Sequence, residues 1–401
     1  MSAPLAGDGG RRAALLLCLV LVPGLAGNMT FQALIPDLQA ELALSATQVG
    51  WISTANYLAY ALSAPLLVGV TDRIDARSVM ALGLAVSVLA GVGSALLVQG
   101  FWSALLWRAV AGIGIAGTYM PGLKALTDRT AGPGQPRLQA LFTAVYSVGT
   151  AASTWLSGLV AATSGWRQAF LVSGLLPAAA ALLLPAVGRH RPAGRATSAG
   201  GGPRAVLAQR RALGFALAYG AHCFELFGFR TWLVAFLVFA AARSGAEVDR
   251  AWIATLATIV LLLGLPASLA GNELAGRLPR APTVAVLMLA SAALGAGLGP
   301  AVPLGFPVVV GLALLYGWLV MSDSSAITVG TVQAAAPELK GRTLALQTLL
   351  GSIGAMLAPL LSGLALDLVG PDTVQGWTAA LATVAAGALL GPLALHRLAR
   401  G

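Results

Sequence analysis

Apolar runs recur along the whole sequence and are separated by short charged or Pro/Gly-rich segments. Most runs have about 18 or more residues, enough for a helix to cross a hydrocarbon core of about 30 Å. Hydrophobic residues fill 58% of the 401 positions, and charged residues only 9%. A soluble domain carries about 25% charged residues, which it needs to cover a surface that faces water. The sequence therefore predicts an all-α polytopic membrane protein.

The punctuating segments predict twelve transmembrane helices. Their approximate ranges are 13–36, 47–70, 78–98, 102–126, 138–162, 166–187, 212–240, 251–271, 283–299, 305–333, 343–366 and 376–396. Only Gly299, Pro300 and Pro303 separate the ninth helix from the tenth. The start, RRAALLLCLVLVPGLAG, also has the charge and short apolar stretch of a signal peptide. Because the apolar run continues to Ile35, we expect a membrane span there.

Lysine and arginine are distributed as expected for cytoplasmic amino and carboxyl termini. With that orientation, 19 of the 24 basic residues fall in predicted cytoplasmic segments. The external loops hold Arg167, Arg243 and Arg250, whereas Arg108 and Arg230 lie inside spans. The net charge of +10 is therefore interpreted as a sign of membrane orientation, and no nucleic-acid partner is expected.

Residue types needed for catalysis or metal binding are scarce. Cys18 and Cys223 both lie in apolar spans, which excludes a disulfide framework and a CxxC zinc site. His222, Cys223, Met120, Met321 and Cys18 offer ligands to a soft metal, but no HxxxH, MxxxM or CxxC spacing supports such a site. GxSxG, HExxH and P-loop motifs are absent from the sequence. We expect neither an enzyme nor a bound metal or organic cofactor.

The chain divides into two similar halves. An Arg-, Gly- and Pro-rich stretch predicts a cytoplasmic linker over 188–211, between six-helix bundles at 1–187 and 212–401. LQALFTAVYSVG (138–149) resembles TLALQTLLGSIG (343–354), and TWLSGLV (154–160) resembles PLLSGLA (359–365), both at an offset of 205. Repeated six-helix units are typical of transporters that bind substrate near the bilayer midplane between their halves.

Several motifs resemble those of the major facilitator superfamily. GVTDRIDARS, in the loop after the second span, matches a superfamily signature at Gly69, Asp72, Arg73 and Arg77, while Asp75 stands where the family usually has glycine. GNELAGRLPR, from position 271, is similar to a degenerate second copy. WRAVAGIGIAG (107–117) resembles the family's intramembrane arginine motif, and GWRQAF (165–170) its usual entry to the sixth span.

The resemblance implies two six-helix bundles with both termini in the cytoplasm, and a conformational latch at the four matching loop residues. It also implies a central cavity lined by the first, fourth, seventh and tenth spans. Many proton-driven exporters of the superfamily have a proline-containing motif in the fifth span, where this chain has YSVGTAASTWLSG (146–158) without proline. That difference favours uptake over multidrug export.

Polar residues inside the spans mark the candidate site, because a charge at bilayer depth costs at least about 2.5–3.5 kcal/mol. Candidates for proton coupling are Glu225, Asp323 and His222. Candidates for the substrate cavity are Asn28, Gln32, Asn56, Tyr60, Arg108, Tyr119, Arg230, Trp232 and Tyr316. Arg230 points about 140° from Glu225 on an ideal helix, so a direct pair needs a bend near Gly228, or each has another partner. Each candidate also has a structural interpretation, as a packed or locally hydrogen-bonded residue.

These observations favour a secondary active transporter that moves a small organic solute by alternating access. The intramembrane arginines suggest an anionic or zwitterionic solute, and the acids suggest the proton gradient as energy source. Proton-driven efflux of drugs or metabolites is the alternative, and a membrane sensor is a further one. The excess of arginine over lysine, with abundant alanine and glycine, suggests a bacterium with a GC-rich genome and therefore its cytoplasmic membrane. We expect a functional monomer surrounded by lipid.

Overall fold

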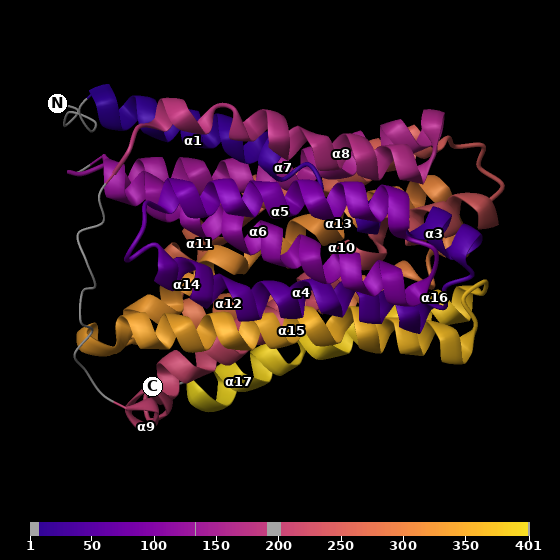
Figure 1. Ribbon diagram of the computed structural model, residues 1–401. Coiled ribbons are helices and arrows are strands. Elements are labelled where there is room, and N and C mark those ends of the chain that lie inside the picture. Colours follow the sequence, from indigo (N-terminus) through magenta and orange to yellow (C-terminus); the bar gives the residue numbers. More distant parts are fainter. Residues whose placement is uncertain (1–7, 133, 191–201, 400–401) are drawn as a thin grey trace. The chain divides into compact units, whose positions relative to one another are not determined.

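The computed structural model describes residues 8–132, 134–190 and 202–399, and these ranges contain helices and turns without strands (Figure 1). Helix contacts divide the chain into two compact units. Unit 1 comprises Met1–Ala43, Ala55–Ala196 and Asp249–Thr258, and unit 2 comprises Leu44–Thr54, Thr197–Val248 and Ile259–Gly401. Residues 191–201 of the predicted linker lie outside the described residues. The boundaries 1–187, 188–211 and 212–401 stay predictions.

Unit 1 contains the helices of the first half of the chain. They are α1 (Asp8–Gly24), α2 (Thr30–Ala33), α3 (Ile35–Leu42), most of α4 (Ala46–Val70), α5 (Ala76–Leu97), α6 (Phe101–Arg129), α7 (Gln135–Ser164), α8 (Trp166–Ala181) and the 3-10 helix η1 (Leu184–Val187). Close packing of α5 against α6 requires glycine, because a Cβ added at Gly83 would overlap the backbone of Gly117. The bundle thus positions α6, which carries Arg108.

Unit 2 contains the remaining helices. They are α9 (Pro203–Leu207), α10 (Arg210–Arg243), α11 (Arg250–Arg277), α12 (Arg280–Leu298), η2 (Val302–Leu304), α13 (Phe306–Ser322), α14 (Ser324–Ala334), η3 (Pro337–Leu339), α15 (Lys340–Val369), α16 (Val374–Ala388) and α17 (Leu390–Leu398). The first turns of α11 belong to unit 1, and the first turns of α4 to unit 2. Helix α10 is the centre of unit 2, because α14, α15, α16 and α17 all pack against it.

Nine helical segments in the described ranges are long and apolar enough to cross a membrane. They are Ala76–Leu97, Phe101–Arg129, Trp166–Val187, Arg210–Arg243, Arg250–Arg277, Arg280–Leu298, Phe306–Ala334, Pro337–Val369 and Val374–Leu398. The predicted spans 13–36, 47–70 and 138–162 coincide with α1 to α3, α4 and α7, which are not among the nine. The count of twelve spans and the location of the termini therefore stay predictions.

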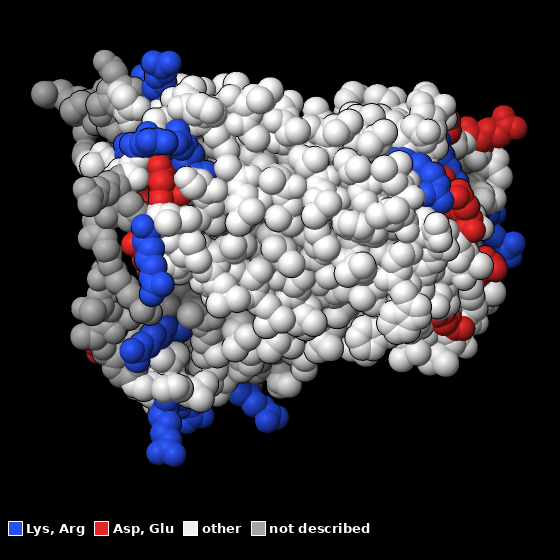
Figure 2. All heavy atoms as spheres, viewed as in Figure 1, with Lys and Arg blue, Asp and Glu red and all other residues white. Residues whose placement is uncertain are grey.

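The surface has the polarity that membrane-spanning helices require. On the face drawn in Figure 2, Lys, Arg, Asp and Glu lie toward the ends of the helices, and the stretch between them consists of uncharged residues. Large apolar side chains such as Leu66, Leu106 and Leu269 are exposed. Lipid tails, unlike water, impose no cost on such side chains.

Two of the predicted spans, the first and the tenth, are interrupted in the structure, and the sequence repeat at an offset of 205 is visible as a pair of similar helices. The first span is interrupted after Gly24 and resumes as the short helices α2 and α3. The tenth is interrupted at Asp323, between α13 and α14. Helices α7 and α15 each have 30 residues and begin at Gln135 and Lys340, which are 205 positions apart. The sequence repeat at that offset thus corresponds to a repeated helix.

Candidate functional site

A histidine and an acid form a buried pair in unit 2. His222 lies on α10, and its Nδ1 atom is 2.7 Å from Oδ1 of Asp323. Both side chains are only 1% exposed. The structure therefore brings together two of the three residues predicted to couple proton movement, from elements about 100 positions apart in sequence.

The end of α13, next to Asp323, packs closely against α11. The Ser322 carbonyl group approaches Gly271 so closely that a Cβ added there would overlap it. Ser322 also turns its hydroxyl back to the Trp318 carbonyl oxygen at 2.8 Å. Glycine at 271 thus allows the end of α13 to approach α11, and this packing places the Asp323 carboxyl group beside α10.

Glu225 is the second buried acid, one helical turn from His222 on the same face of α10. Its side chain is fully buried, and its Oε2 atom accepts a hydrogen bond from Ser291 Oγ of α12 at 3.0 Å. Tyr316 of α13 is also fully buried, with its hydroxyl beside the same carboxyl group and its ring 4.4 Å from that of Phe229. Sequence reasoning missed Ser291 because the ninth span appeared apolar, although it is the one polar side chain near the middle of α12.

This arrangement suits proton binding. Ionising a carboxyl group in a site without water is costly unless a partner compensates the charge. Glu225 and Asp323 are near enough to influence each other electrostatically, and His222 pairs with Asp323. The cluster is therefore chemically able to hold an exchangeable proton.

Arg230 is also on α10, which runs unbroken through Gly228. A Cβ at Gly228 would lie 2.7 Å from a methyl group of Val384, so this glycine serves packing against α16. The Arg230 guanidinium places Nη2 3.8 Å from the Met321 sulfur atom, whereas Glu225 bonds to Ser291. No bend at Gly228 brings the two side chains together.

In unit 1, Arg108 is a buried cation. Its side chain is 3% exposed, with Nη2 3.5 Å from Gln32 Oε1 and the guanidinium carbon 5.0 Å from the centre of the Phe31 ring. Within the described ranges, no carboxylate oxygen lies within 4.0 Å of it. Its buried Nε–H donates no hydrogen bond to any acceptor in those ranges. Arg108 thus carries a positive charge that the described chain does not neutralise.

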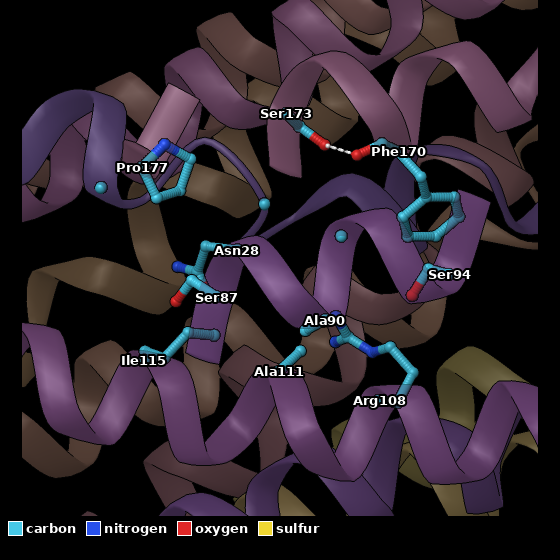
Figure 3. A pocket seen from close by; sticks show the side chains of 13 residues that line it. Asn28, Ser87, Ala90, Ser94, Arg108, Ala111, Ile115, Phe170, Ser173 and Pro177 are labelled. Carbon is cyan, nitrogen blue, oxygen red and sulfur yellow. Dashed lines mark hydrogen bonds between the residues drawn. The ribbon is translucent and has the colours of Figure 1, made fainter. Parts of the chain in front are cut away.

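A small cavity lies beside Arg108 and is enclosed by α1, α5, α6 and α8 (Figure 3). Its lining includes Asn28, Ser87, Ser94, Arg108, Ile115 and Ser173. The volume of about 20 Å³ has room for about one water molecule and is too small for an organic solute. Asn28 donates to Thr150 Oγ1 at 3.1 Å, and Asn56 donates to the Arg108 carbonyl oxygen at 3.0 Å.

The predicted aromatic cavity residues have packing partners. The Tyr119 ring lies 4.4 Å from that of Tyr146, and Tyr60 packs in the same cluster. Trp232 is 1% exposed and donates from Nε1 to Ser362 Oγ at 2.8 Å. A substrate-binding role for Tyr60, Tyr119 or Trp232 stays a prediction.

In the loop after α4, the hydrogen bonds converge on Asp75, the residue at which the loop differs from the superfamily signature. Asp75 accepts two hydrogen bonds from Arg129 Nη2, at 2.8 and 2.9 Å, and one from the Arg77 backbone N–H at 3.0 Å. Arg129 also donates to the Gly188 carbonyl oxygen, and Arg77 to two carbonyls of η1. Burial raises the pKa of Asp75, but these hydrogen bonds outweigh it and lower the pKa below its usual value.

The other predicted latch residues have local contacts. Asp72 donates its backbone N–H to the Gly69 carbonyl oxygen at 3.3 Å, and Arg73 follows in the same turn. Within residues 8–132, 134–190 and 202–399, no ion pair involves the side chains of Asp72 or Arg73. Asp75 forms ion pairs with Arg129 at 2.8 Å and with the predicted latch residue Arg77 at 3.9 Å. Sequence reasoning did not select Asp75 or Arg129. The signal in the sequence that could have identified Asp75 is that it replaces the glycine usual in the family at this position.

A metal site has no support in the described part of the chain, where no group of three His, Cys, Asp or Glu side chains is placed to hold an ion.

Comparison with known proteins gives three curated relatives. A segment of 168 residues is 32% identical to the uncharacterized MFS-type transporter YcaD of Salmonella arizonae, covering 41% of this chain and 43% of the relative. The methylenomycin A resistance protein of Bacillus subtilis is 29% identical over 37% of this chain and 32% of its own length. The niacin transporter NiaP of Acinetobacter baylyi is 26% identical over 34% and 30%. The chain thus matches less than half of the length of each relative.

Solved structures show the same fold over nearly the whole chain. A bacterial homolog of the human lysosomal transporter Spinster, inward-facing and unoccupied, has a TM-score of 0.82 at 15% identity and covers 98% of both chains. The human organic anion transporter MFSD10 has a TM-score of 0.65 at 19% identity, covering 96% of this chain and 99% of its own. The sequence profile of the Major Facilitator Superfamily matches residues 16–338. This multi-pass membrane chain therefore belongs to the Major Facilitator Superfamily of transporters.

Proposed function

We propose that this chain is a secondary active transporter that moves a small organic anion or zwitterion by alternating access, coupled to protons. The observation that carries the proposal is the buried cluster of His222, Asp323 and Glu225 in unit 2. Three ionisable groups at bilayer depth are costly, and such groups in membrane proteins are typically functional. A proton gradient supplies the energy in this proposal, and no organic cofactor takes part.

Arg108 supports an anionic group on the solute. Its positive charge is buried without a carboxylate partner within 4.0 Å in the described ranges, so an incoming anion would provide the missing charge. The adjacent cavity of about 20 Å³ is too small for a solute. In this proposal the anion therefore reaches Arg108 only after the surrounding helices have moved.

The relatives are consistent with this class of solute. One is a niacin transporter, and one protein of the same fold is an organic anion transporter. All three curated relatives come from bacteria, which supports the cytoplasmic membrane of a bacterium as the location. Proton-driven efflux of a drug or metabolite is the second candidate, favoured by the match to a methylenomycin A resistance protein.

Counterflow in proteoliposomes tests the proposed solute class. Niacin and nicotinamide form a matched pair of probes, because they differ mainly in the acidic group, and nucleosides and cationic dyes serve as further probes. Accumulation of niacin or another organic anion, lost in Arg108→Met, is the expected result. Counterflow of cationic dyes alone would instead support the efflux candidate. Counterflow that persists unchanged in Arg108→Met would reject Arg108 as the anion-binding residue.

A further inference from the structure

Ser291 of α12 is a buried hydroxyl group with two acceptors. Its side chain is fully buried, and Oγ lies 3.0 Å from Glu225 Oε2 and 3.0 Å from the backbone carbonyl oxygen of Met288. A serine hydroxyl has one proton to donate and two lone pairs that accept. It can therefore donate to only one of these two oxygens at a time.

The two choices correspond to the two protonation states of Glu225. When the Glu225 carboxyl group is ionised, Ser291 donates its proton to Oε2. When a proton binds Oε2, the new Glu225 O–H donates to Ser291 Oγ, and the Ser291 proton turns to the Met288 carbonyl oxygen. Only the O–H bond on Glu225 is formed or broken, and both states keep their hydrogen bonds.

We propose that Ser291 is a positioning residue whose hydroxyl group serves both protonation states of Glu225 by exchanging the carbonyl oxygen of Met288 for the carboxylate as acceptor. The inference rests on the proposed function, in which Glu225 binds and releases a proton. An unpaired polar group in a site without water is costly, so a partner that suits only one state would trap Glu225 in that state. Ser291 removes this obstacle without moving a helix.

Few side chains near Glu225 could hydrogen-bond to it in both of its protonation states. The side chains that ionise in the middle of the packed elements are Tyr219, His222, Cys223 and Arg230 of α10, Tyr316 of α13 and Asp323 after it. The remaining ones of α10 and α12, Arg210, Arg211, Arg243 and Arg280, lie in the terminal turns. Helix α16 has no acidic or basic residue, and those of α15 and α17 lie in their terminal turns. His222 already pairs with Asp323. Ser291 Oγ lies 3.0 Å from Glu225 Oε2, and the Tyr316 hydroxyl lies beside the same carboxyl group. Of the two, Ser291 is the one that also has a backbone carbonyl oxygen as a second acceptor in the described contacts.

Infrared difference spectroscopy of the purified full chain in lipid, titrated with acid, tests the inference without a known solute. Protonated Glu225 contributes a C=O stretching band that Glu225→Gln removes. Valine has nearly the same shape as threonine, with a methyl group in place of the hydroxyl. Ser291→Val is therefore compared with Ser291→Thr. The valine variant is expected to shift the band to higher frequency, because the hydrogen bond is lost. Its titration midpoint is expected to rise by about one pH unit, since the charged state loses the stronger hydrogen bond.

Two control variants distinguish the loss of the Ser291 hydrogen bond from a change in side-chain packing. Ser291→Thr is expected to keep the band and midpoint of the wild type. Thr231→Val removes a buried α10 hydroxyl that bonds only to the Phe227 carbonyl oxygen in the described contacts, and should change neither. If Ser291→Val does not fold, Ser291→Ala makes the same comparison.

The outcomes distinguish the inference from the proposed function. A band that Glu225→Gln removes but Ser291→Val leaves unchanged in frequency and midpoint would overturn the role of Ser291 and leave the proposed function intact. A spectrum in which Glu225→Gln removes no pH-dependent band would overturn both, because Glu225 would not take up a proton.

Discussion

Replacing Arg108 by methionine is expected to leave the empty protein as stable as the wild type, or slightly more stable, while abolishing solute binding. A charged arginine costs about 2.5–3.5 kcal/mol at the centre of a membrane helix, and this is the upper bound for Arg108, the eighth of the 29 residues of α6. Against this, the variant loses the contact of the guanidinium with Phe31, about 2 kcal/mol when desolvated, and the long hydrogen bond to Gln32, about 0.5 kcal/mol. The net change is a gain of at most about 1 kcal/mol.

Arg129→Met is the matched control, and we expect this variant to lower the free energy of unfolding. Arg129 is also buried, with a side chain 7% exposed, but it bonds to both carboxylate oxygens of Asp75. Removing one partner of a buried ion pair costs about 3–5 kcal/mol. We expect about 2–3 kcal/mol here, because Asp75 keeps two backbone N–H donors, from Arg77 and His190.

Thermal unfolding in lipid nanodiscs measures both variants. At about 2–4 °C per kcal/mol for a unit of roughly 200 residues, the Tm of Arg108→Met should equal or slightly exceed that of the wild type. The Tm of Arg129→Met should fall by about 4 °C or more. A transported anion at saturating concentration should raise the Tm of the wild type and not that of Arg108→Met. A drop in Tm for Arg108→Met as large as that for Arg129→Met would refute the reasoning, because Arg108 would then be a structural residue.

Three further predictions concern packing and pH. Gly83→Ala should destabilise unit 1 by about 1–3 kcal/mol, measured as a lower Tm, because the added Cβ overlaps the α6 backbone; an unchanged Tm would contradict the close packing. The folded-state pKa of Asp75 is lowered, so its bond to Arg129 contributes stability that is fully present above about pH 4 and is lost as the pH falls through the folded-state pKa. Asp75→Asn should therefore flatten the acid limb of a stability profile, and a parallel profile would contradict this account. Trp232→Phe should cost about 1 kcal/mol through the lost bond to Ser362, and no change in unfolding would show that this bond contributes nothing.

The positions of the helices were predictable from the sequence, because apolar runs and charged breaks follow the thickness of a bilayer. The family was predictable as well, since the loop and intramembrane arginine motifs keep recognisable residues. Hydropathy could not show the interruptions after Gly24 and at Asp323, because an interrupted span and a continuous one can have the same composition. The contact that places Asp323, between Ser322 and Gly271, joins residues far apart in sequence.

The candidate site was only partly predictable for the same reason. Helical periodicity placed His222 and Glu225 on one face of α10, since they are three positions apart. It could not supply their partners, because Asp323 and Ser291 come from other helices. Ser291 was overlooked because a single hydroxyl in an apolar span commonly bonds to its own helix. Asp75 was treated as a weak match to a motif, although its carboxylate is what Arg129 binds.

The most direct test of proton coupling is the proton flux that a transported solute induces in proteoliposomes. Wild type is compared with Glu225→Gln and with the control Glu273→Gln, which changes an exposed acid paired with Arg277. The account predicts solute-induced proton movement in the wild type and the control, and its loss in Glu225→Gln. Solute transport without proton movement, unchanged in Glu225→Gln, would contradict the account and leave Glu225 a structural acid.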